Sequence, residues 1–90
     1  MRMGAPSIHI NHADRLAMGR RVRAARIRAG LTYAQLSAAM GVSAQTVADW
    51  QNGGRPDDAE RRAKLCELLD VTEAELWAEY ETALAAASTP

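Results

Sequence analysis

Hydrophobic residues recur along this chain at the spacing of one face of an α-helix, and polar turns divide them into five segments. In the first segment, residues 12–28, the apolar stripe consists of Met18, Val22 and Ala25, and Ala29 continues it. The same periodicity predicts four further helices, over about residues 33–40, 44–50, 58–69 and 73–87. We therefore expect an all-α fold in which each helix buries one face in a shared core.

A capping residue precedes each expected helix, with a side chain that can accept from the first free backbone amides. The caps are Asn11, Thr32, Ser43, Asp57 and Thr72, and three of them are paired with a residue three positions later: Gln35, Glu60 and Glu75. Gly41 permits a sharp turn between the second and third helices. Two short helices joined so closely have the layout of a helix-turn-helix, whose second helix enters the major groove of DNA.

The chain's 90 residues are enough for one domain with a modest core. Its formal net charge is zero, which by itself argues against binding to nucleic acid. The charges are nevertheless separated. Basic residues dominate the first third, in which Asp14 is the only acidic residue: Arg2, Arg15, Arg20, Arg21, Arg23, Arg26 and Arg28. Acidic residues dominate a late stretch: Glu67, Asp70, Glu73, Glu75, Glu79 and Glu81. This separation indicates either a molecule with a basic and an acidic end or two solvated helix faces of opposite sign.

Composition excludes several other classes of protein. No apolar run approaches the ~18 residues of a membrane span, and the N-terminal residues lack the apolar core of a signal peptide. Cys66 is the only cysteine, so an intrachain disulfide is excluded and a reducing compartment fits. The sequence contains no catalytic triad pattern, no phosphate-binding glycine loop and no cluster of metal ligands. We expect a cytoplasmic, nucleoid-associated protein that is not an enzyme and binds no cofactor or metal ion.

The first residues have mixed composition and a Gly-Ala-Pro break, so we expect residues 1–11 to form a flexible N-terminal arm. Within it, residues 7–10 alternate like a strand that could pair with a partner chain. Residues 12–87 are predicted to form a single helix-turn-helix domain, and residues 88–90 are predicted to fray.

From residue 19 to about residue 77, the chain resembles the phage-repressor family of helix-turn-helix proteins, also called Cro/C1 or XRE. The matching stretches are RRVRAARIRAGLTYAQL, AAMGVSAQTVADWQNG and LCELLDVTEAELW. The resemblance implies a compact five-helix bundle of the lambda-repressor type, with the helix-turn-helix at helices two and three. It also implies a small bacterial or phage transcriptional regulator. Such a regulator would act as a repressor. It would bind double-stranded DNA sequence-specifically, as a homodimer on a palindromic operator.

The resemblance also carries a set of DNA contacts onto this chain. The start of the third helix, which meets base edges in the family, is occupied by Ala44, Gln45, Thr46 and Asp49. Contacts to the DNA backbone fall on Tyr33, Asn52 and Arg55. The set of DNA contacts also includes Gln35, near the start of the second helix, and Ser43, which precedes the third.

Gln45 is the best candidate for base recognition, because its amide offers one donor and one acceptor, which match N7 and N6 of adenine. Thr46 can form a hydrogen bond or place its methyl group on thymine, and Ala44 can make only the apolar contact. Asp49 either accepts from a cytosine amino group or repels a phosphate. Because these positions include no basic residue, sequence specificity is expected to depend partly on DNA shape.

Three residues depart from the family pattern. Gln51 stands where a Glu commonly pairs with the arginine matching Arg26, so Arg26 either keeps a hydrogen bond to Gln51 or turns to Asp49. Tyr33 stands in place of a Gln and can still donate to a phosphate. Arg62 stands where an aliphatic core residue is common, so the start of the fourth helix is expected to pack less deeply.

An alternative function depends on the last expected helix. Trp77, Tyr80 and Leu84 recur on it at helical spacing. In a homodimer, this face would contact a second copy of the chain. In an antitoxin-like or other interaction protein of the same fold, the same face would hold a protein partner.

Overall fold

The computed structural model describes residues 10–88, and within them the chain forms five helices and no strand. The helices are α1 (His12–Arg28), α2 (Tyr33–Met40), α3 (Ala44–Trp50), α4 (Ala59–Leu69) and α5 (Glu73–Ser88). The predicted all-α fold is confirmed. Most of the predicted arm and two of the three residues predicted to fray lie outside the described residues, whereas Ser88 belongs to α5. None of the described helices is long and apolar enough to cross a membrane.

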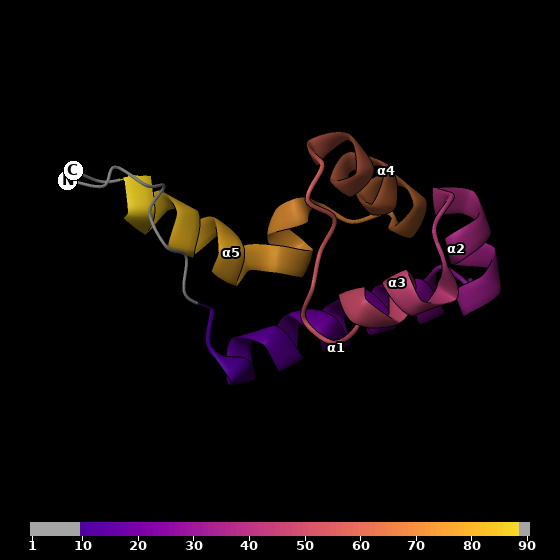
Figure 1. Cartoon of the computed structure of the whole chain (residues 1–90), viewed down its shortest axis with the longest axis horizontal. Helices are drawn as coiled ribbons and strands as arrows, with labels where there is room; N and C mark the ends of the chain where they lie inside the picture. Colours follow the sequence, from indigo (N-terminus) through magenta and orange to yellow (C-terminus); the bar gives the residue numbers. More distant parts are fainter. Residues whose placement is uncertain (1–9, 89–90) are drawn as a thin grey trace.

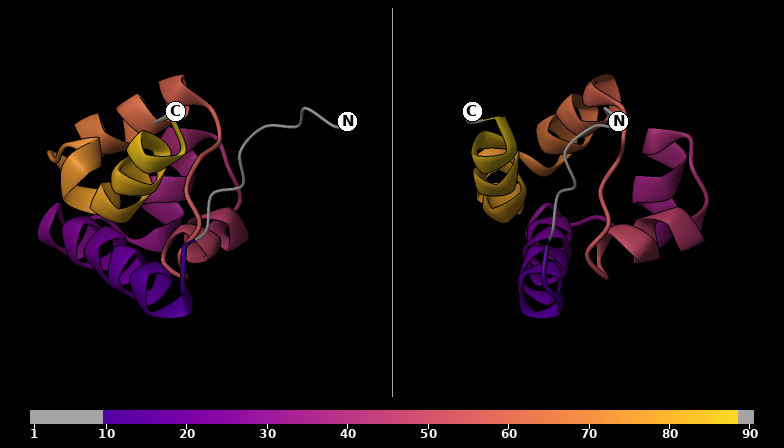
Figure 2. Two further views of the ribbon diagram at one scale, coloured as in Figure 1. Left: turned by 90° about the vertical axis from the view of Figure 1, so that its left-hand side faces the viewer. Right: turned by 60° about the vertical axis from the view of Figure 1, so that its left-hand side comes forward.

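The helices form two packed pairs, α1 with α5 and α2 with α3, and α4 lies over both pairs (Figures 1 and 2). The C-terminal half of α5 extends beyond the other helices (Figure 1). All five helices contribute buried apolar side chains to one core: Met18, Val22, Ala25, Leu36, Met40, Val47, Trp50, Leu65, Cys66, Leu69, Leu76 and Trp77. Removing these side chains from water is the main force holding the bundle together. The predicted stripe on α1 stops at Ala25, because Ala29 follows the last helical residue and is exposed.

Most of the predicted caps are confirmed. Asn11 accepts from the Asp14 amide at 2.8 Å, and Thr72 and Glu75 form a reciprocal pair of hydrogen bonds. The prediction that Asp57 caps α4 is wrong. The capping residue is Asp58, which accepts from the Glu60 amide at 3.1 Å. The reason is that α4 begins at Ala59, so Asp58 is the extended residue directly before the first helical turn.

Helix α5 contains a break that the apolar spacing did not predict. Trp77 has non-helical backbone angles, φ −127° and ψ 43°. Its side chain is completely buried, and its indole Nε1 has no hydrogen-bond partner among the described residues. The Trp77 ring thus lies in the core at the break, and the rest of α5 runs outward beyond it (Figure 1).

Two glycines set the distance between α1 and the loop that follows α3. A Cβ atom added to Gly19 would lie 2.2 Å from the carbonyl oxygen of Gln51. A Cβ added to Gly53, which has φ 105°, would lie 2.5 Å from the Cβ of Arg15. Only residues without a side chain allow the two backbones to approach this closely. This contact places the C-terminal end of α3 against α1.

Candidate nucleic-acid interface

Local hydrogen bonds form the predicted helix-turn-helix. Thr32 Oγ1 accepts from the Gln35 amide at 3.0 Å, and Gln35 Oε1 accepts from the Thr32 amide at 2.9 Å, which completes a capping box. Gly41 ends α2 with φ 69°, in the left-handed region. Ser43 Oγ then accepts from the Thr46 amide at 3.1 Å and starts α3. Gln35 and Ser43, both predicted to contact DNA, thus first serve to cap the two helices.

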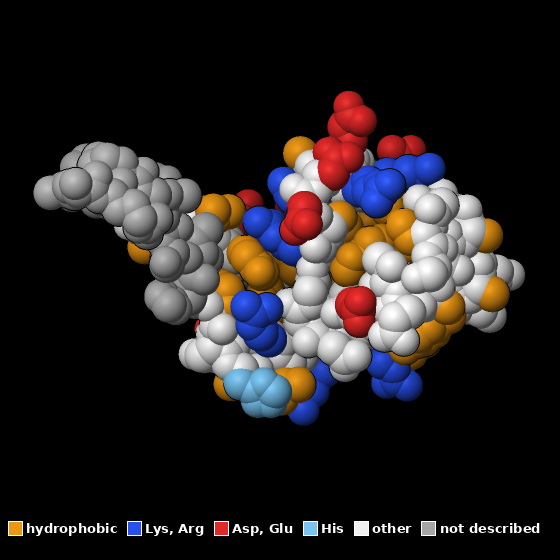
Figure 3. Space-filling view, in the orientation of Figure 1, with side chains coloured by type: hydrophobic (Ala, Val, Ile, Leu, Met, Phe, Trp, Pro, Cys, Tyr) orange, Lys and Arg blue, Asp and Glu red, His pale blue; other side chains and the backbone are white. Residues whose placement is uncertain are grey.

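The outer face of α3 is polar and carries no cation. Ser43, Ala44, Gln45 and Asp49 are exposed, and Thr46 is half-buried. The same helix turns Val47 and Trp50 into the core, which fixes which face remains outside. Figure 3 shows the surface over α3 as largely white, with an acidic side chain among the polar groups. The structure brings together all the residues predicted at the start of this helix.

Asp49 accepts a hydrogen bond from Gln45, with 3.1 Å between Oδ1 and Nε2. The two residues are one helical turn apart, where side chains on the same face meet. The bond uses one of the two amide protons of Gln45. It leaves Oε1 and the second N–H available, which are the acceptor and the donor that adenine requires. The sequence proposed two roles for Asp49, and neither included this contact.

The hydroxyl groups of Ser43 and Thr46 lie 3.0 Å apart. Because Ser43 Oγ already accepts from the Thr46 amide, the two residues form a small closed set of hydrogen bonds at the start of α3. The methyl group of Thr46 is left as the part of this side chain best suited to an apolar contact with a thymine methyl.

Arg26 lies behind the start of α2 and holds the end of α3. The residue is 9% exposed, and its Nε donates to Gln51 Oε1 at 2.7 Å. Its Nη1 donates to the Leu31 carbonyl at 2.7 Å. Of the two alternatives that the sequence left open, the structure shows the hydrogen bond to Gln51 rather than a turn toward Asp49.

Tyr33 covers Arg26 at the surface. The guanidinium carbon of Arg26 lies 4.5 Å from the centre of the Tyr33 ring, within range of a cation–π contact. Gln51 Nε2 donates to the Tyr33 hydroxyl. Tyr33 itself is 37% exposed. The predicted contact residue is therefore available at the surface and also linked to a buried cation.

The loop residues predicted to meet phosphate differ in their surroundings. Asn52 is exposed, whereas the Arg55 guanidinium lies 4.1 Å from the centre of the Tyr80 ring. Burial, together with the nearby charge of Arg62, lowers the pKa of Arg55. Arg55 is thus bound to α5, a contact that connects a predicted DNA residue with a predicted dimer residue.

The three α5 residues predicted to contact a second copy also lie in different surroundings. Trp77 has no exposed surface and belongs to the core, so it offers no area to a partner. Tyr80 is half-buried beneath Arg55, and Leu84 is 39% exposed. Sequence spacing placed these residues on one stripe, but in the structure Trp77 lies in the core, Tyr80 contacts Arg55 and Leu84 is exposed.

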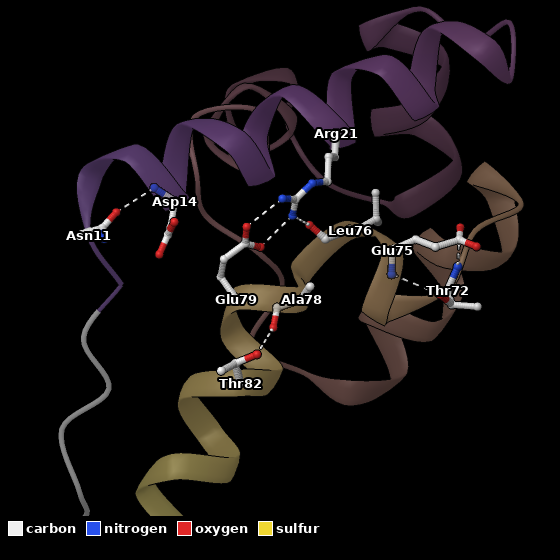
Figure 4. A network of polar contacts seen from close by, with 9 residues as sticks. All are labelled: Asn11, Asp14, Arg21, Thr72, Glu75, Leu76, Ala78, Glu79 and Thr82. Carbon is white, nitrogen blue, oxygen red and sulfur yellow. Dashed lines mark hydrogen bonds and ion pairs between the residues drawn. The ribbon is translucent and has the colours of Figure 1, made fainter.

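Two arginines hold α5 in place, and the sequence pattern revealed neither role. Arg21 donates twice to Glu79, at 2.6 Å each, and once to the Leu76 carbonyl beside the break (Figure 4). The hydrogen bonds from Arg21 lower the pKa of Glu79. Arg62 donates to the carbonyls of residues 56 and 57 and to the side chain of Glu73. Arg62 thus ties the loop before α4 to the start of α5.

No group of three or more His, Cys, Asp or Glu side chains in residues 10–88 is arranged to hold a metal ion. Cys66 is buried, and burial with the nearby carboxylates of Glu73 and Glu75 raises its pKa to about 11. The thiol is therefore protonated at neutral pH and poorly suited to nucleophilic chemistry.

Two capped helices joined at a left-handed glycine, with a polar face at the start of the second, define a DNA-binding helix-turn-helix protein of the kind that regulates transcription. The sequence profile of the helix-turn-helix domain matches residues 17–85, and the chain belongs to this family. The match agrees with the resemblance to phage-repressor-like proteins. A comparison with curated proteins found no match.

Proposed function

We propose that this protein is a sequence-specific transcriptional repressor that places α3 in the major groove of double-stranded DNA. The observation that carries the proposal is the outer face of α3, where Gln45 is exposed and held by Asp49 on a helix fixed to the core through Val47 and Trp50. In this proposal, residues 12–87 act as one domain and two copies bind a palindromic operator, since the two-fold axis of a dimer matches such a site.

Recognition of bases rests mainly on Gln45. Its free Oε1 and its remaining N–H suit a bidentate contact with adenine, which is worth ~1–3 kcal/mol of discrimination. The methyl groups of Ala44 and Thr46 suit a neighbouring thymine. Asn52 and Tyr33 would contact the backbone beside these bases.

Attraction to the phosphates comes from outside α3. The exposed arginines of α1 and the first turn of α2 supply positive potential, whereas Asp49 opposes it. We therefore expect modest affinity that falls steeply with salt concentration.

One experiment tests the proposal directly: selection of bound sites from a random double-stranded DNA library. We expect an inverted repeat whose half-sites contain an adenine. Half-site spacing near one helical turn would support a dimer with one α3 in each successive groove. Recovery of no enriched sequence would refute sequence-specific binding.

Gln45→Ala tests the proposed base contact on the selected site. We expect a loss of about tenfold or more in affinity for the operator, because a bidentate contact disappears. Affinity for random DNA should change little. Equal losses on both DNAs would rule out base recognition by Gln45.

Asp49→Ala tests the proposed repulsion and the contact with Gln45 together. Removing the carboxylate should raise affinity for random DNA, because one negative charge leaves the interface. The preference for the operator over random DNA should fall, since Gln45 loses the bond that orients it. Weaker binding to random DNA would contradict the repulsion.

A second candidate function is the binding of a protein partner, as in an antitoxin-like protein. The observation that favours it is a groove of about 470 Å³ between Ile10 and Asp14 on one side and residues 78–86 of α5 on the other. Purification in a stoichiometric complex with a different protein would support this function. A monodisperse homodimer that binds the selected operator would favour the repressor.

A further inference from the structure

Arg26 is a buried cation whose hydrogen bonds go to neutral acceptors, Gln51 Oε1 and the Leu31 carbonyl. The ion pairs within residues 10–88 join Arg21 to Glu79 and Arg62 to Glu73, and neither of them includes Arg26. Its charge is therefore not cancelled by a carboxylate. In the low dielectric of the protein, that charge acts strongly on the groups around it.

The directions of the hydrogen bonds around Arg26 follow from the chemistry of the three side chains. A guanidinium can only donate, so the oxygen of the Gln51 amide must face Arg26. The amide nitrogen then faces Tyr33 and donates to its hydroxyl. The phenolic oxygen is thus an acceptor inside the protein, and its own proton is left to be donated outward.

This chain of hydrogen bonds ends at the surface, in the first turn of α2. Tyr33 is 37% exposed, and its ring lies against the Arg26 guanidinium. Hydrogen bonds in a chain polarise one another, so a cation at the inner end makes the outer hydroxyl a stronger donor. The group best matched to a strengthened donor in a positive field is an anionic oxygen.

We propose that the Arg26–Gln51–Tyr33 hydrogen-bond chain binds a DNA backbone phosphate at the Tyr33 hydroxyl, with Arg26 acting through the other two residues rather than by contact. The inference rests on the proposed DNA binding. A phosphate is favoured over a base because Tyr33 lies on α2, whereas the face turned to the bases is the start of α3. Tyr33 is the contact residue, and Arg26 and Gln51 are positioning residues.

Gln51→Glu tests this proposal, because it preserves the acceptor for Arg26 while reversing the outer part of the chain. A carboxylate cancels the charge of Arg26 and cannot donate to Tyr33, so the Tyr33 proton turns inward to the carboxylate. We expect unchanged or higher thermal stability and about tenfold weaker binding to the selected operator at low salt. The slope of log Kd against log salt concentration should decrease by about one, the change expected when one phosphate contact is lost.

Tyr33→Phe, alone and combined with Gln51→Glu, separates the chain from a general charge effect. Alone, Tyr33→Phe should weaken binding by a similar factor. In the Gln51→Glu background it should cost little more, because the hydroxyl no longer points outward. Equal losses in both backgrounds would overturn the proposal. If Gln51→Glu does not fold, unchanged operator affinity of Tyr33→Phe would overturn it.

Ala74→Glu is the matched control for charge, since it adds one carboxylate at an exposed position in the first turn of α5, outside the proposed DNA surface. It should change operator affinity far less than Gln51→Glu, and an equal loss would overturn the proposal. The proposed DNA binding and the proposed hydrogen-bond chain are refuted by different results. Absence of any selected site for the unmodified protein refutes the proposed function. Normal operator binding by Gln51→Glu refutes only the hydrogen-bond chain.

Discussion

Gly19→Ala should destabilise the protein although alanine is the better helix former. Gly19 is buried within α1, and an alanine Cβ would lie 2.2 Å from the Gln51 oxygen and 2.6 Å from the Gln51 carbonyl carbon. Ordinary contact begins at 3.4 Å, so the loop after α3 must retreat by roughly an ångström. Both opposing atoms belong to the backbone, so a change of side-chain rotamer cannot relieve the clash.

The expected magnitude is a balance of two effects. Overpacking costs about 1–3 kcal/mol, and an overlap of this depth against backbone atoms belongs in the upper part of that range, about 2–3 kcal/mol. The helix propensity of alanine offsets about 1 kcal/mol. A net loss of about 1–2 kcal/mol should lower Tm by about 5–15 °C for a domain of this size. Because Gln51 carries the hydrogen bond to Arg26, operator affinity should fall as well.

Denaturant unfolding followed by circular dichroism measures this free energy. Ala24→Gly is the matched control, because Ala24 is exposed on the same helix and reports the helix-propensity term alone, about 1 kcal/mol. If Gly19→Ala is as stable as the unmodified protein, or more stable, the close approach of α1 to the α3 loop is refuted.

Three further predictions concern the rest of the bundle. Because Arg21 lowers the pKa of Glu79, their contact stabilises the fold above the ordinary glutamate pKa of 4.5, and this stabilisation is lost as the pH falls through the lower pKa of the folded state. Glu79→Gln should therefore be less stable than the unmodified protein at pH 7 and lose less stability on acidification, as measured by denaturant unfolding at a series of pH values. A parallel loss in both proteins would contradict this prediction. Cys66, with its pKa raised to about 11, should react with a thiol reagent at pH 8 far more slowly in the native protein than in denaturant, and equal rates would show that the thiol is not buried. Tyr80→Phe should keep the ring beneath Arg55 and nearly full stability, whereas Tyr80→Leu should lose ~0.5–1 kcal/mol in the same unfolding assay; equal stability of the two variants would exclude a cation–π contribution.

The sequence predicted the helices well because their signals are local. The capping box of Thr32 and Gln35 joins residues three positions apart, and the pair of Thr72 and Glu75 does the same. Such contacts form within one helical turn, so spacing alone identifies them. The error at α4 was one residue, because Asp57 and Asp58 are both competent caps and local pattern does not distinguish them.

The sequence predicted the exposed face at the start of α3 better than the contacts that its residues make. The residues at the start of α3 do share an exposed face, as helical spacing requires. The bond between Gln45 and Asp49 lies within one turn and was open to prediction from the same spacing. The placement of Arg55 was not, because the ring beneath it belongs to α5.

By itself, the sequence determined which segments are helices, where most of them begin, and that the second and third form a helix-turn-helix. These features depend on interactions between residues three or four positions apart. The tertiary structure decided what the arginines do and how α5 runs. Arg21 meets Glu79 across 58 positions, Gln51 joins Arg26 to Tyr33 across α1, α2 and α3, and α5 breaks at Trp77, whose side chain is buried in the core. These outcomes depend on which surfaces approach in space, and Gly19 and Gly53 permit one such approach, between α1 and the loop after α3.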